Sequence, residues 1–146
     1  MKLNFVTINS LPEGELLTGI VELHKKIFGV DTKLISKLTN KPKLLTIVAF
    51  NGTNVVGYKI GYEIDSNTFY SWLGGVDQYY RKQGIASILM KNQHQFLKEE
   101  GYRTVQTKTM NKWRSMLILN IKNGFDVVNT QIDSQGIHKI LLEKKL

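Results

Sequence analysis

The middle of the chain switches from helical to strand periodicity, and this switch limits the possible folds more than any other feature. Residues 44–50 form an apolar run typical of a buried strand, and Asn51-Gly52 follows, a strong signal for a tight hairpin turn. Residues 56–64 then alternate along the return strand, and a turn at residues 65–68 leads into a strand over residues 69–76. The pattern predicts three consecutive strands in an antiparallel meander.

Helical and strand patterns flank the meander on both sides. The further predicted strands cover residues 3–8, 103–109, 125–130 and 137–143. The predicted helices cover residues 10–28, 31–38, 85–100 and 114–123, with Asp31 capping the second and Gly29, Gly101 and Gly124 at three helix ends. Strand runs mixed with one crossover predict an α+β domain with a mixed sheet, and the length of 146 residues predicts one domain over residues 1–146.

Composition excludes several classes of site. The chain has no cysteine, which excludes disulfides, thiolate zinc sites, iron–sulfur clusters and a cysteine nucleophile. No apolar run approaches the roughly 18 residues of a membrane-spanning helix, and the first residues lack the apolar stretch of a signal peptide. We therefore expect a soluble, cytoplasmic protein that does not enter the membrane.

The chain is basic, with 20 Lys and Arg residues against 12 Asp and Glu residues and a net charge of +8. Such a charge fits nucleic acid, an anionic membrane, a phosphate-bearing ligand or simply a basic surface. The basic residues are scattered, and neither a zinc finger nor an aromatic RNA-binding motif is present. Nucleic acid is therefore not an expected partner.

The segment over residues 76–87 leaves a strand, forms a basic loop and enters a helix at Gly84. The first turn of a helix has unpaired N–H groups and partial positive charge. Gly84 and the small Ala86 would let an anion approach these groups, while Arg81 and Lys82 add full charges. The segment predicts a phosphate cradle, although it matches neither the Walker loop nor G-x-G-x-x-G. The alternative is an ordinary helix start where Gly84 only relieves crowding.

These residues also resemble a known pattern. The run Arg81-Lys82-Gln83-Gly84-Ile85-Ala86 resembles the R/Q-x-x-G-x-G/A motif of the GCN5-related N-acetyltransferases, the GNAT superfamily. A predicted strand precedes the run, and a helix, a strand and a second helix follow it. The second helix ends at Asn123-Gly124-Phe125, which resembles the closing Gly-Phe of the family. The element order agrees with the family over essentially the whole chain.

The resemblance implies a fold and a cosubstrate. The fold is a mixed, mostly antiparallel central sheet of about six to seven strands, flanked by about four helices in three layers. The cosubstrate is acetyl-CoA, whose pantetheine would align with the strand end at Val76 where neighbouring strands splay apart. Asn111 would reach the pantetheine, or else serve only as a loop or helix-cap residue. The residues expected around the pyrophosphate are Arg81, Lys82, Gln83, Gly84, Ile85, Ala86 and Ser87.

One departure from the family concerns the proton donor. Many relatives have a tyrosine four residues before the closing glycine, where it protonates the leaving thiolate, but this chain has Asn120. An amide can hydrogen-bond a thiolate or the pantetheine, but it is no useful acid near neutral pH. Water or another tyrosine would then supply the proton. The nearby candidates, for which packing or surface positions are also expected, are Tyr70, Tyr79 and Tyr80.

The general base is sought among the carboxylates, because an amine must lose a proton before it attacks. Glu63 is the first candidate. If residues 66–67 form a two-residue turn, Glu63 lies opposite Tyr70 and shares a sheet face with Tyr70, Trp72 and Gly61. The alternative is an ordinary exposed strand carboxylate. Asp65 and Asp77 are expected to be turn residues.

The remaining chemistry-bearing residues are isolated. His24, His94 and His138 do not form a pair with metal-ligand spacing, so we expect no metal. His94 lies opposite the apolar stripe of its predicted helix, which predicts a solvated side chain. Trp72 and Trp113 could line an acceptor pocket or belong to the core.

Together these features predict an acetyl-CoA-dependent N-acetyltransferase. The acetyl group would pass to a primary amine of a small molecule or peptide by direct attack, and the chain could form a homodimer as relatives often do. The alternative is a GNAT-like module that binds CoA without catalysis.

Overall fold

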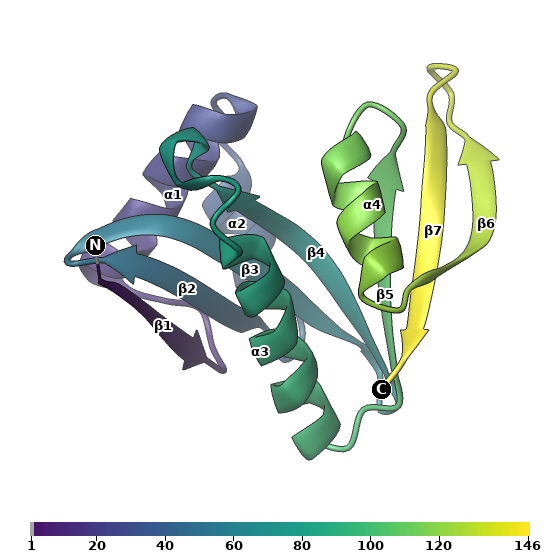
Figure 1. The fold of residues 1–146 in the computed structure, drawn as a ribbon, viewed down its shortest axis with the longest axis horizontal. Helices are drawn as coiled ribbons and strands as arrows, with labels where there is room; N and C mark the ends of the chain where they lie inside the picture. Colours follow the sequence, from purple (N-terminus) through teal and green to yellow (C-terminus); the bar gives the residue numbers. More distant parts are fainter. Residues whose placement is uncertain (1) are drawn as a thin grey trace.

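The predicted meander forms the centre of a larger sheet. The structure, a computed structural model, describes residues 2–146, which form one seven-stranded sheet in the order β1-β2-β3-β4-β5-β7-β6 (Figure 1). The strands are β1 (Leu3–Ile8), β2 (Leu45–Asn51), β3 (Asn54–Asp65), β4 (Thr68–Val76), β5 (Thr104–Met110), β6 (Asp126–Ile132) and β7 (His138–Lys145). The helices are α1 (Gly14–Phe28), α2 (Leu34–Thr39), α3 (Ile85–Glu99), α4 (Arg114–Lys122) and the short 3-10 helix η1 (Gln78–Tyr80).

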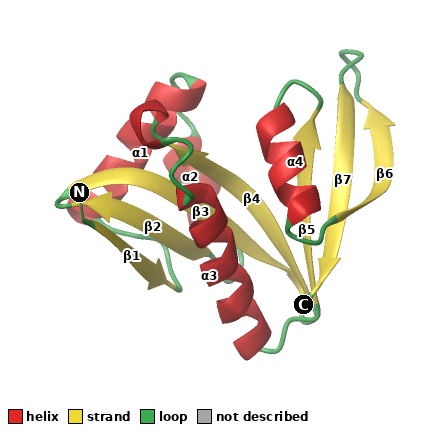
Figure 2. Ribbon diagram, viewed as in Figure 1, coloured by secondary structure: helices red, strands yellow, loops and turns green. Residues whose placement is uncertain are grey.

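The elements stack in three layers, with helices on both faces of the sheet (Figure 2). One apolar cluster joins α1 and α2 to β2 and β3, and the other joins α3 to the opposite face, with Leu117 and Leu119 of α4 packed against it. All neighbouring strands are antiparallel except β4 and β5. The mixed, mostly antiparallel sheet predicted from the sequence is confirmed.

Alternation along β3 determines which side chains meet which helices. Tyr58 and Ile60 pack in the cluster under α1 and α2. A Cβ at Gly57 would instead contact Ile85 and Leu89 of α3. Because side chains alternate along a strand, Lys59 shares the α3 face with Gly57.

The parallel pair of strands separates along its length. The strands β4 and β5 pair only from Thr68–Thr104 to Ser71–Thr107, where the Thr107 hydroxyl donates to the Ser71 carbonyl at 2.8 Å. Beyond this point β4 continues to Val76 beside β3, while β5 continues beside β7. Figure 1 shows the two strands meeting at one end and standing apart at the other. This separation, called the β4–β5 gap below, leaves one edge of each strand without a strand neighbour.

Two β-bulges change the register of the meander. The two-residue turn is as predicted, because Asp65 pairs with Thr68, but Glu63 then pairs with Phe69 rather than Tyr70. The predicted pairing of Glu63 is therefore wrong. Ile64 is an extra residue on β3, and Trp72 is an extra residue on β4 that restores the register.

Helix starts differ from the prediction by a few residues. The first helix begins at Gly14 rather than near residue 10, and the second begins at Leu34. Asp31 does not occupy the cap position, which is Lys33, but its Oδ1 accepts from the Lys33 N–H at 3.0 Å. The carboxylate thus orders the turn before α2 without capping it.

The close packing at Gly61 predicts a sharp loss of stability on substitution. An added Cβ would overlap the Phe69 ring and the Tyr70 carbonyl oxygen. We expect Gly61→Ala to lower the free energy of unfolding by about 1–3 kcal/mol in urea denaturation, as overpacking generally does. Gly74→Ala is the matched control, because its Cβ would approach no atom closer than 3.3 Å. Equal losses in both variants would contradict this account.

Candidate functional site

The N-terminus of α3 presents unpaired backbone donors. Gly84 occupies the N-cap in the left-handed region, with φ 80°, and its carbonyl accepts the first helical bond from the Ile88 N–H at 3.1 Å. The N–H groups of the turn before Ile88 have no acceptor within the helix, and they carry the positive end of the helix dipole. This turn therefore has the donors and the charge to hold an anionic group.

Space and backbone shape at this turn fit a bound anion. A Cβ at Gly84 would meet no heavy atom within 4 Å, so the turn faces open space. Lys82 also has a left-handed backbone, with φ 63°, which is uncommon outside glycine and concentrates at functional sites. Arg81 and Lys82 are exposed beside the turn. The predicted cradle residues 81–87 thus lie together at one helix start.

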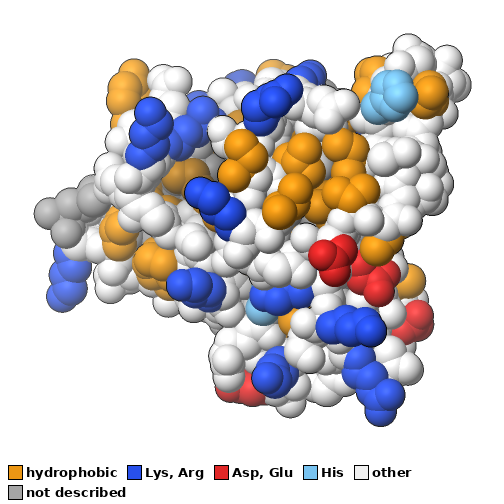
Figure 3. Space-filling view, turned by 45° about the vertical axis from the view of Figure 1, so that its right-hand side comes forward, with side chains coloured by type: hydrophobic (Ala, Val, Ile, Leu, Met, Phe, Trp, Pro, Cys, Tyr) orange, Lys and Arg blue, Asp and Glu red, His pale blue; other side chains and the backbone are white. Residues whose placement is uncertain are grey.

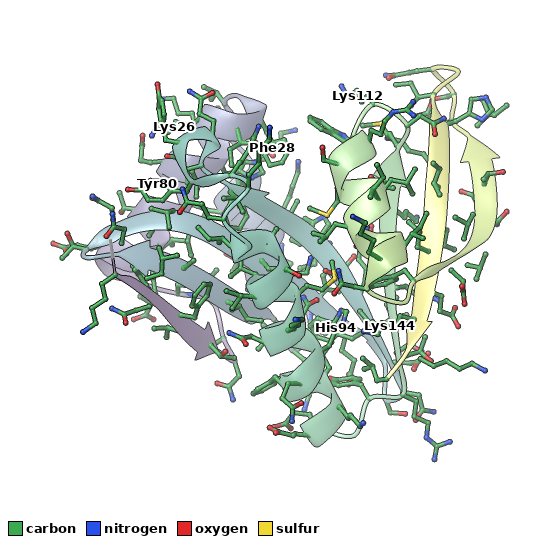
Figure 4. All side chains as sticks on the ribbon, viewed as in Figure 1. Lys26, Phe28, Tyr80, His94, Lys112 and Lys144 are labelled. Atoms are coloured by element: carbon green, nitrogen blue, oxygen red, sulfur yellow. The ribbon has the colours of Figure 1, made fainter. Side chains whose placement is uncertain are left out.

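The loop before α3 is held by contacts to earlier parts of the chain. The Asp77 carboxylate accepts from the Tyr79 N–H at 3.0 Å and pairs with Lys26 of α1 at 3.1 Å. The Tyr80 hydroxyl accepts from the Asn51 amide at 2.9 Å. Figure 4 shows Lys26 and Tyr80 on the same side of the molecule, near this loop. These contacts hold the start of α3, and Asp77 is confirmed as a turn residue.

The two predicted asparagines lie on the other side of the β4–β5 gap. Asn111 is exposed in the turn after β5, and the N-cap of α4 is Trp113, so Asn111 is not a helix cap. Asn120 is buried on the last turn of α4 and is 2% exposed. Its carbonyl accepts from the N–H groups of Asn123 and Phe125 at 3.1 and 3.0 Å, which closes the helix.

Aromatic side chains lie on the α1 side of the gap. Phe28 at the end of α1 packs edge-on against Trp113, with ring centroids 5.7 Å apart, so the two halves of the sheet are bridged here. Figure 4 shows Phe28 and Lys112 facing each other across the open end of the gap. Gly75 of β4 lies beneath, where a Cβ would crowd Ile27 at 2.6 Å and approach Phe28 at 3.6 Å. The gap thus has a polar α3 side and an aromatic α1 side.

Comparison with known proteins identifies this arrangement. The model described as the acetyltransferase (GNAT) family matches residues 17–114, about two thirds of the chain. The chain belongs to the acetyltransferase (GNAT) family. The resemblance seen in the sequence is confirmed, and with it the enzyme class of an acetyl-CoA-dependent acetyltransferase. A search of curated proteins finds no matching relative.

Solved structures match the fold over nearly the whole chain. The ribosomal-protein-S18-alanine N-acetyltransferase from Escherichia coli has a TM-score of 0.82 at 13% identity, over 99% of this chain and 94% of that one. A GNAT acetyltransferase from Elizabethkingia anophelis with acetyl-CoA bound has a TM-score of 0.76 at 20% identity, over 99% and 98%. Arabidopsis thaliana NAA60 in complex with acetyl-CoA has a TM-score of 0.80 at 17% identity, over 99% of each chain. At these identities the likeness shows the GNAT fold.

Glu63 lies away from the cradle. It faces the start of β4, whereas the cradle follows the end of β4 at Val76, seven residues and roughly 20 Å along the strand. Its Oε1 accepts from the Tyr102 hydroxyl at 2.9 Å, and burial followed by this contact raises the pKa of Tyr102 to about 12. The shared face with Tyr70 and Trp72 does not form, because the bulge at Ile64 pairs Glu63 with Phe69, and Tyr70 and Trp72 pack against Tyr62 on the other face. We therefore do not propose Glu63 as the general base.

The aromatic alternatives occupy packing or surface positions. Tyr70 packs edge-on against Tyr62 at 5.5 Å, and Tyr79 is 78% exposed. Trp72 packs against Tyr62 on the α1 face, beneath the Lys41 ammonium at 4.9 Å. The packing positions expected for these rings are confirmed, whereas Trp113 is 40% exposed at the end of the gap.

The burial of Lys59 and Gln93 was not predicted from the sequence, and the prediction of a solvated His94 is wrong. His94 is 8% exposed rather than solvated, because its face of α3 turns toward Phe125 and Lys144. Gln93 and Lys59 are also buried. A signal for Lys59 was present, since strand alternation places it on the same inward face as Gly57 and Gly61. A signal for Gln93 was also present, since it lies four residues from both Leu89 and Leu97 on the apolar face of α3.

A groove of about 1100 Å³ lies on another side of the loop before α3. It runs between α1 and the β2–β3 turn, and its lining includes Glu15, Glu22, Lys26, Asp77 and Tyr80. The α3 cradle does not line it. The groove is therefore separate from the β4–β5 gap, although both border the same loop.

The outer surface carries no long basic stripe in the view of Figure 3, where Lys and Arg side chains are scattered. Apolar side chains gather on the same face, and Ile118 and Ile121 of α4 are 47% and 52% exposed.

Within residues 2–146, no helix is long and apolar enough to cross a membrane. The described residues also contain no group of three or more His, Cys, Asp or Glu side chains suited to a metal.

The Asp77 contacts predict an acid-dependent contribution to stability. Its pKa is lowered, first by the Tyr79 N–H and further by Lys26, so the stabilisation is present above the unfolded pKa near 4 and disappears as pH falls through the folded pKa. We expect Asp77→Ala to lower the free energy of unfolding by about 1 kcal/mol at pH 7 and by less in acid, measured by denaturation across pH.

Lys26→Met is the control for this experiment. It removes only the ion pair of a lysine that is 67% exposed, so its effect should be smaller. An Asp77→Ala loss that does not change with pH would contradict the assignment.

Proposed function

We propose that this GNAT protein transfers an acetyl group from acetyl-CoA to a primary amine of a small molecule or a peptide. The observation that carries the proposal is the unpaired N-terminal turn of α3 beside the open end of the β4–β5 gap. A helix start of this kind binds phosphate oxygens through N–H groups and charge. Two of the similar structures, from Elizabethkingia anophelis and Arabidopsis thaliana, are named as having acetyl-CoA bound.

The cradle and the gap would bind different parts of acetyl-CoA. The backbone of residues 83–87 would hold the pyrophosphate, with Arg81 and Lys82 adding positive charge. The free edge of β4 between Ser71 and Val76 would hydrogen-bond the pantetheine as a strand does. Asn111 and Asn120 would contact the pantetheine from the α4 side of the gap.

The reaction is a direct transfer. A neutral amine attacks the thioester carbonyl carbon, and an N–H on the free edge of β4 near Val76 stabilises the charge that develops on the carbonyl oxygen. The chain has no cysteine, so a cysteine acyl-enzyme is excluded. Because the Glu63 carboxylate is held by the Tyr102 hydroxyl, opposite the part of β4 that still pairs with β5, the amine proton leaves to water.

The acceptor would enter from the α1 side, opposite the cradle. There the exposed rings of Phe28 and Trp113 flank the gap, and Ile27 and Phe28 of α1 pack closely on Gly75. The net charge of +8 disfavours a polycation, so an acidic or neutral acceptor fits best. The cytoplasmic location and the homodimer stay predictions.

Substitution at Gly84 tests the cradle. A Cβ there would occupy the space expected for the pyrophosphate, so we expect Gly84→Ala to weaken acetyl-CoA binding at least about tenfold, measured by calorimetry and thermal shift. Gly136→Ala is a matched control, because Gly136 also has φ 80° and open surroundings but lies in the β6–β7 turn. Both variants carry the backbone strain of a left-handed alanine, roughly 1–2 kcal/mol.

Only Gly84→Ala should lose binding. Equal acetyl-CoA affinity in Gly84→Ala and the wild type would contradict pyrophosphate binding at the cradle. Acetyl-CoA at a hundredfold excess over its Kd should stabilise the wild type by roughly 2.7 kcal/mol, and dephospho-CoA should stabilise it less if a basic residue reads the 3′-phosphate.

A turnover assay distinguishes an active acetyltransferase from a CoA-binding module without catalysis. Free CoA released from acetyl-CoA is measured across a panel of amines, amino acids and peptides, and one acceptor that forms an N-acetyl product supports the proposal. Asn120 is the observation that favours the alternative of a CoA-binding module. Tight acetyl-CoA binding with no product over the whole panel would favour that module.

A further inference from the structure

A cluster of polar side chains lies beneath α3, between β3 and β7. It consists of Lys59 on β3, Gln93 and His94 on α3, and Lys144 on β7, and is called the Lys59 cluster below. Lys59, Gln93 and His94 are 9%, 0% and 8% exposed. Buried polar groups of this kind are normally hydrogen-bonded, so each one without a partner needs a physical explanation.

The side chain of Lys59 lies beside Gly74 of β4. Lys59 pairs with Gly74, and its Cγ lies 3.8 Å from the position that a Gly74 Cβ would take. Gly74 is three residues beyond Ser71, where β4 has lost its contact with β5. Because Gly74 has no side chain, β4 does not cover the Lys59 stem where its partnership with β5 has ended.

The cluster offers donors and no negative charge. The Lys144 ammonium lies 3.1 Å from His94 Nδ1, and because an ammonium only donates, the neutral ring carries its proton on Nε2. Figure 4 shows His94 and Lys144 pointing toward each other between α3 and β7. His94 Nε2 and both amide atoms of Gln93 have no partner among the described residues. No carboxylate pairs with Lys59 or Lys144 in residues 2–146.

Burial and neighbouring charges lower the pKa values of Lys59 and His94. Burial lowers the pKa of Lys59 to about 8. Burial, followed by the charges of Lys144 and Lys59, lowers the pKa of His94 to about 3, so that ring is neutral at pH 7. The β2 residue paired with Lys59 is the apolar Ile47, and Gly74 adds no charge from β4. An ammonium with this pKa is mostly protonated at pH 7 and yet gives up its proton readily.

We propose that Lys59 is the acid of the acetyl transfer, donating its proton to the CoA sulfur as the thiolate leaves, while Gln93 and the His94 N–H hydrogen-bond that sulfur. The inference rests on the proposed function. The reaction creates a thiolate anion in the gap. The Lys59 cluster supplies N–H donors and positive charge, which stabilise an anion. Asn120, which stands where relatives have an acidic hydroxyl, cannot take this role.

The step balances without another reactant. The acceptor nitrogen forms a bond to the acetyl carbon, the carbon–sulfur bond breaks, and its electron pair stays on sulfur. One proton passes from Lys59 Nζ to sulfur and gives CoA thiol. The neutral Lys59 amine regains a proton from water before the next turnover.

The test compares CoA with desulfo-CoA, in which hydrogen replaces the thiol. We expect the wild type to bind CoA roughly tenfold or more tightly at pH 8, because a hydrogen bond to a charged group contributes this much, and Lys59→Met to lose the preference. Calorimetry measures both ligands, and the thiolate absorbance of bound CoA across pH gives its thiol pKa. That pKa should lie below the value for free CoA in the wild type and return toward it in Lys59→Met.

Lys91→Met is the matched control, because Lys91 is exposed on the outer face of α3 and should keep the wild-type preference. Lys59→Arg should keep the CoA preference but slow turnover, since a guanidinium does not release its proton near neutral pH. This variant still tests the proposal if Lys59→Met fails to fold.

The outcomes separate the two proposals. Equal binding of CoA and desulfo-CoA by the wild type, or an unchanged preference and thiol pKa in a folded Lys59→Met, would overturn the role of Lys59 and leave the proposed function standing. If the wild type binds neither ligand, the proposed function fails, and the role of Lys59 fails with it.

Discussion

The divergence of one parallel strand pair organises the whole site. After the Ser71–Thr107 contact, β4 and β5 follow different neighbours, so each keeps an edge of unpaired backbone groups inside the molecule. Unpaired backbone groups in a protein interior need a partner, and an extended ligand supplies one as a strand would. The gap would thus position the pantetheine of the proposed function through backbone groups, without any dedicated side chain. The start of α3 then needs only to hold the charged end of such a ligand.

Several otherwise unrelated features of the chain depend on this gap. Gly74 and Gly75 leave β4 without side chains beside the gap, where Ile27 of α1 packs closely on Gly75, and the bulge at Trp72 lies just beside them. Phe28 and Trp113 bridge the two halves of the sheet on one side, and the Lys59 cluster lies on the other. A fold that separates two strands must stabilise both edges. This chain does so with aromatic contacts on one face and polar groups on the other.

The contrast between accurate and wrong predictions follows the range of the interactions. The meander, the Gly84 turn and the closing Gly124 depend on neighbours within a few residues, and all were predicted from local patterns. The register at Glu63 depends on bulges that no local pattern marked, and the extra residue Ile64 shifts the pairing by one until the bulge at Trp72 restores it. Burial of His94 depends on β7, fifty residues away along the chain. The position of the candidate cofactor residues at one helix start was therefore predictable, and so was the inward face of Lys59, but the side chains that surround it were not.

The sequence by itself determined the element order, the basic glycine turn before the α3 helix and the membership of the GNAT family, because these depend on periodicity, turn chemistry and a short motif. Only the tertiary structure decided which polar side chains meet. Lys59, Gln93 and His94 come from two elements whose periods differ, and all three are buried because α3 packs on this face of β3. Packing geometry of that kind is determined by all the contacts of the core together, and no segment encodes it alone.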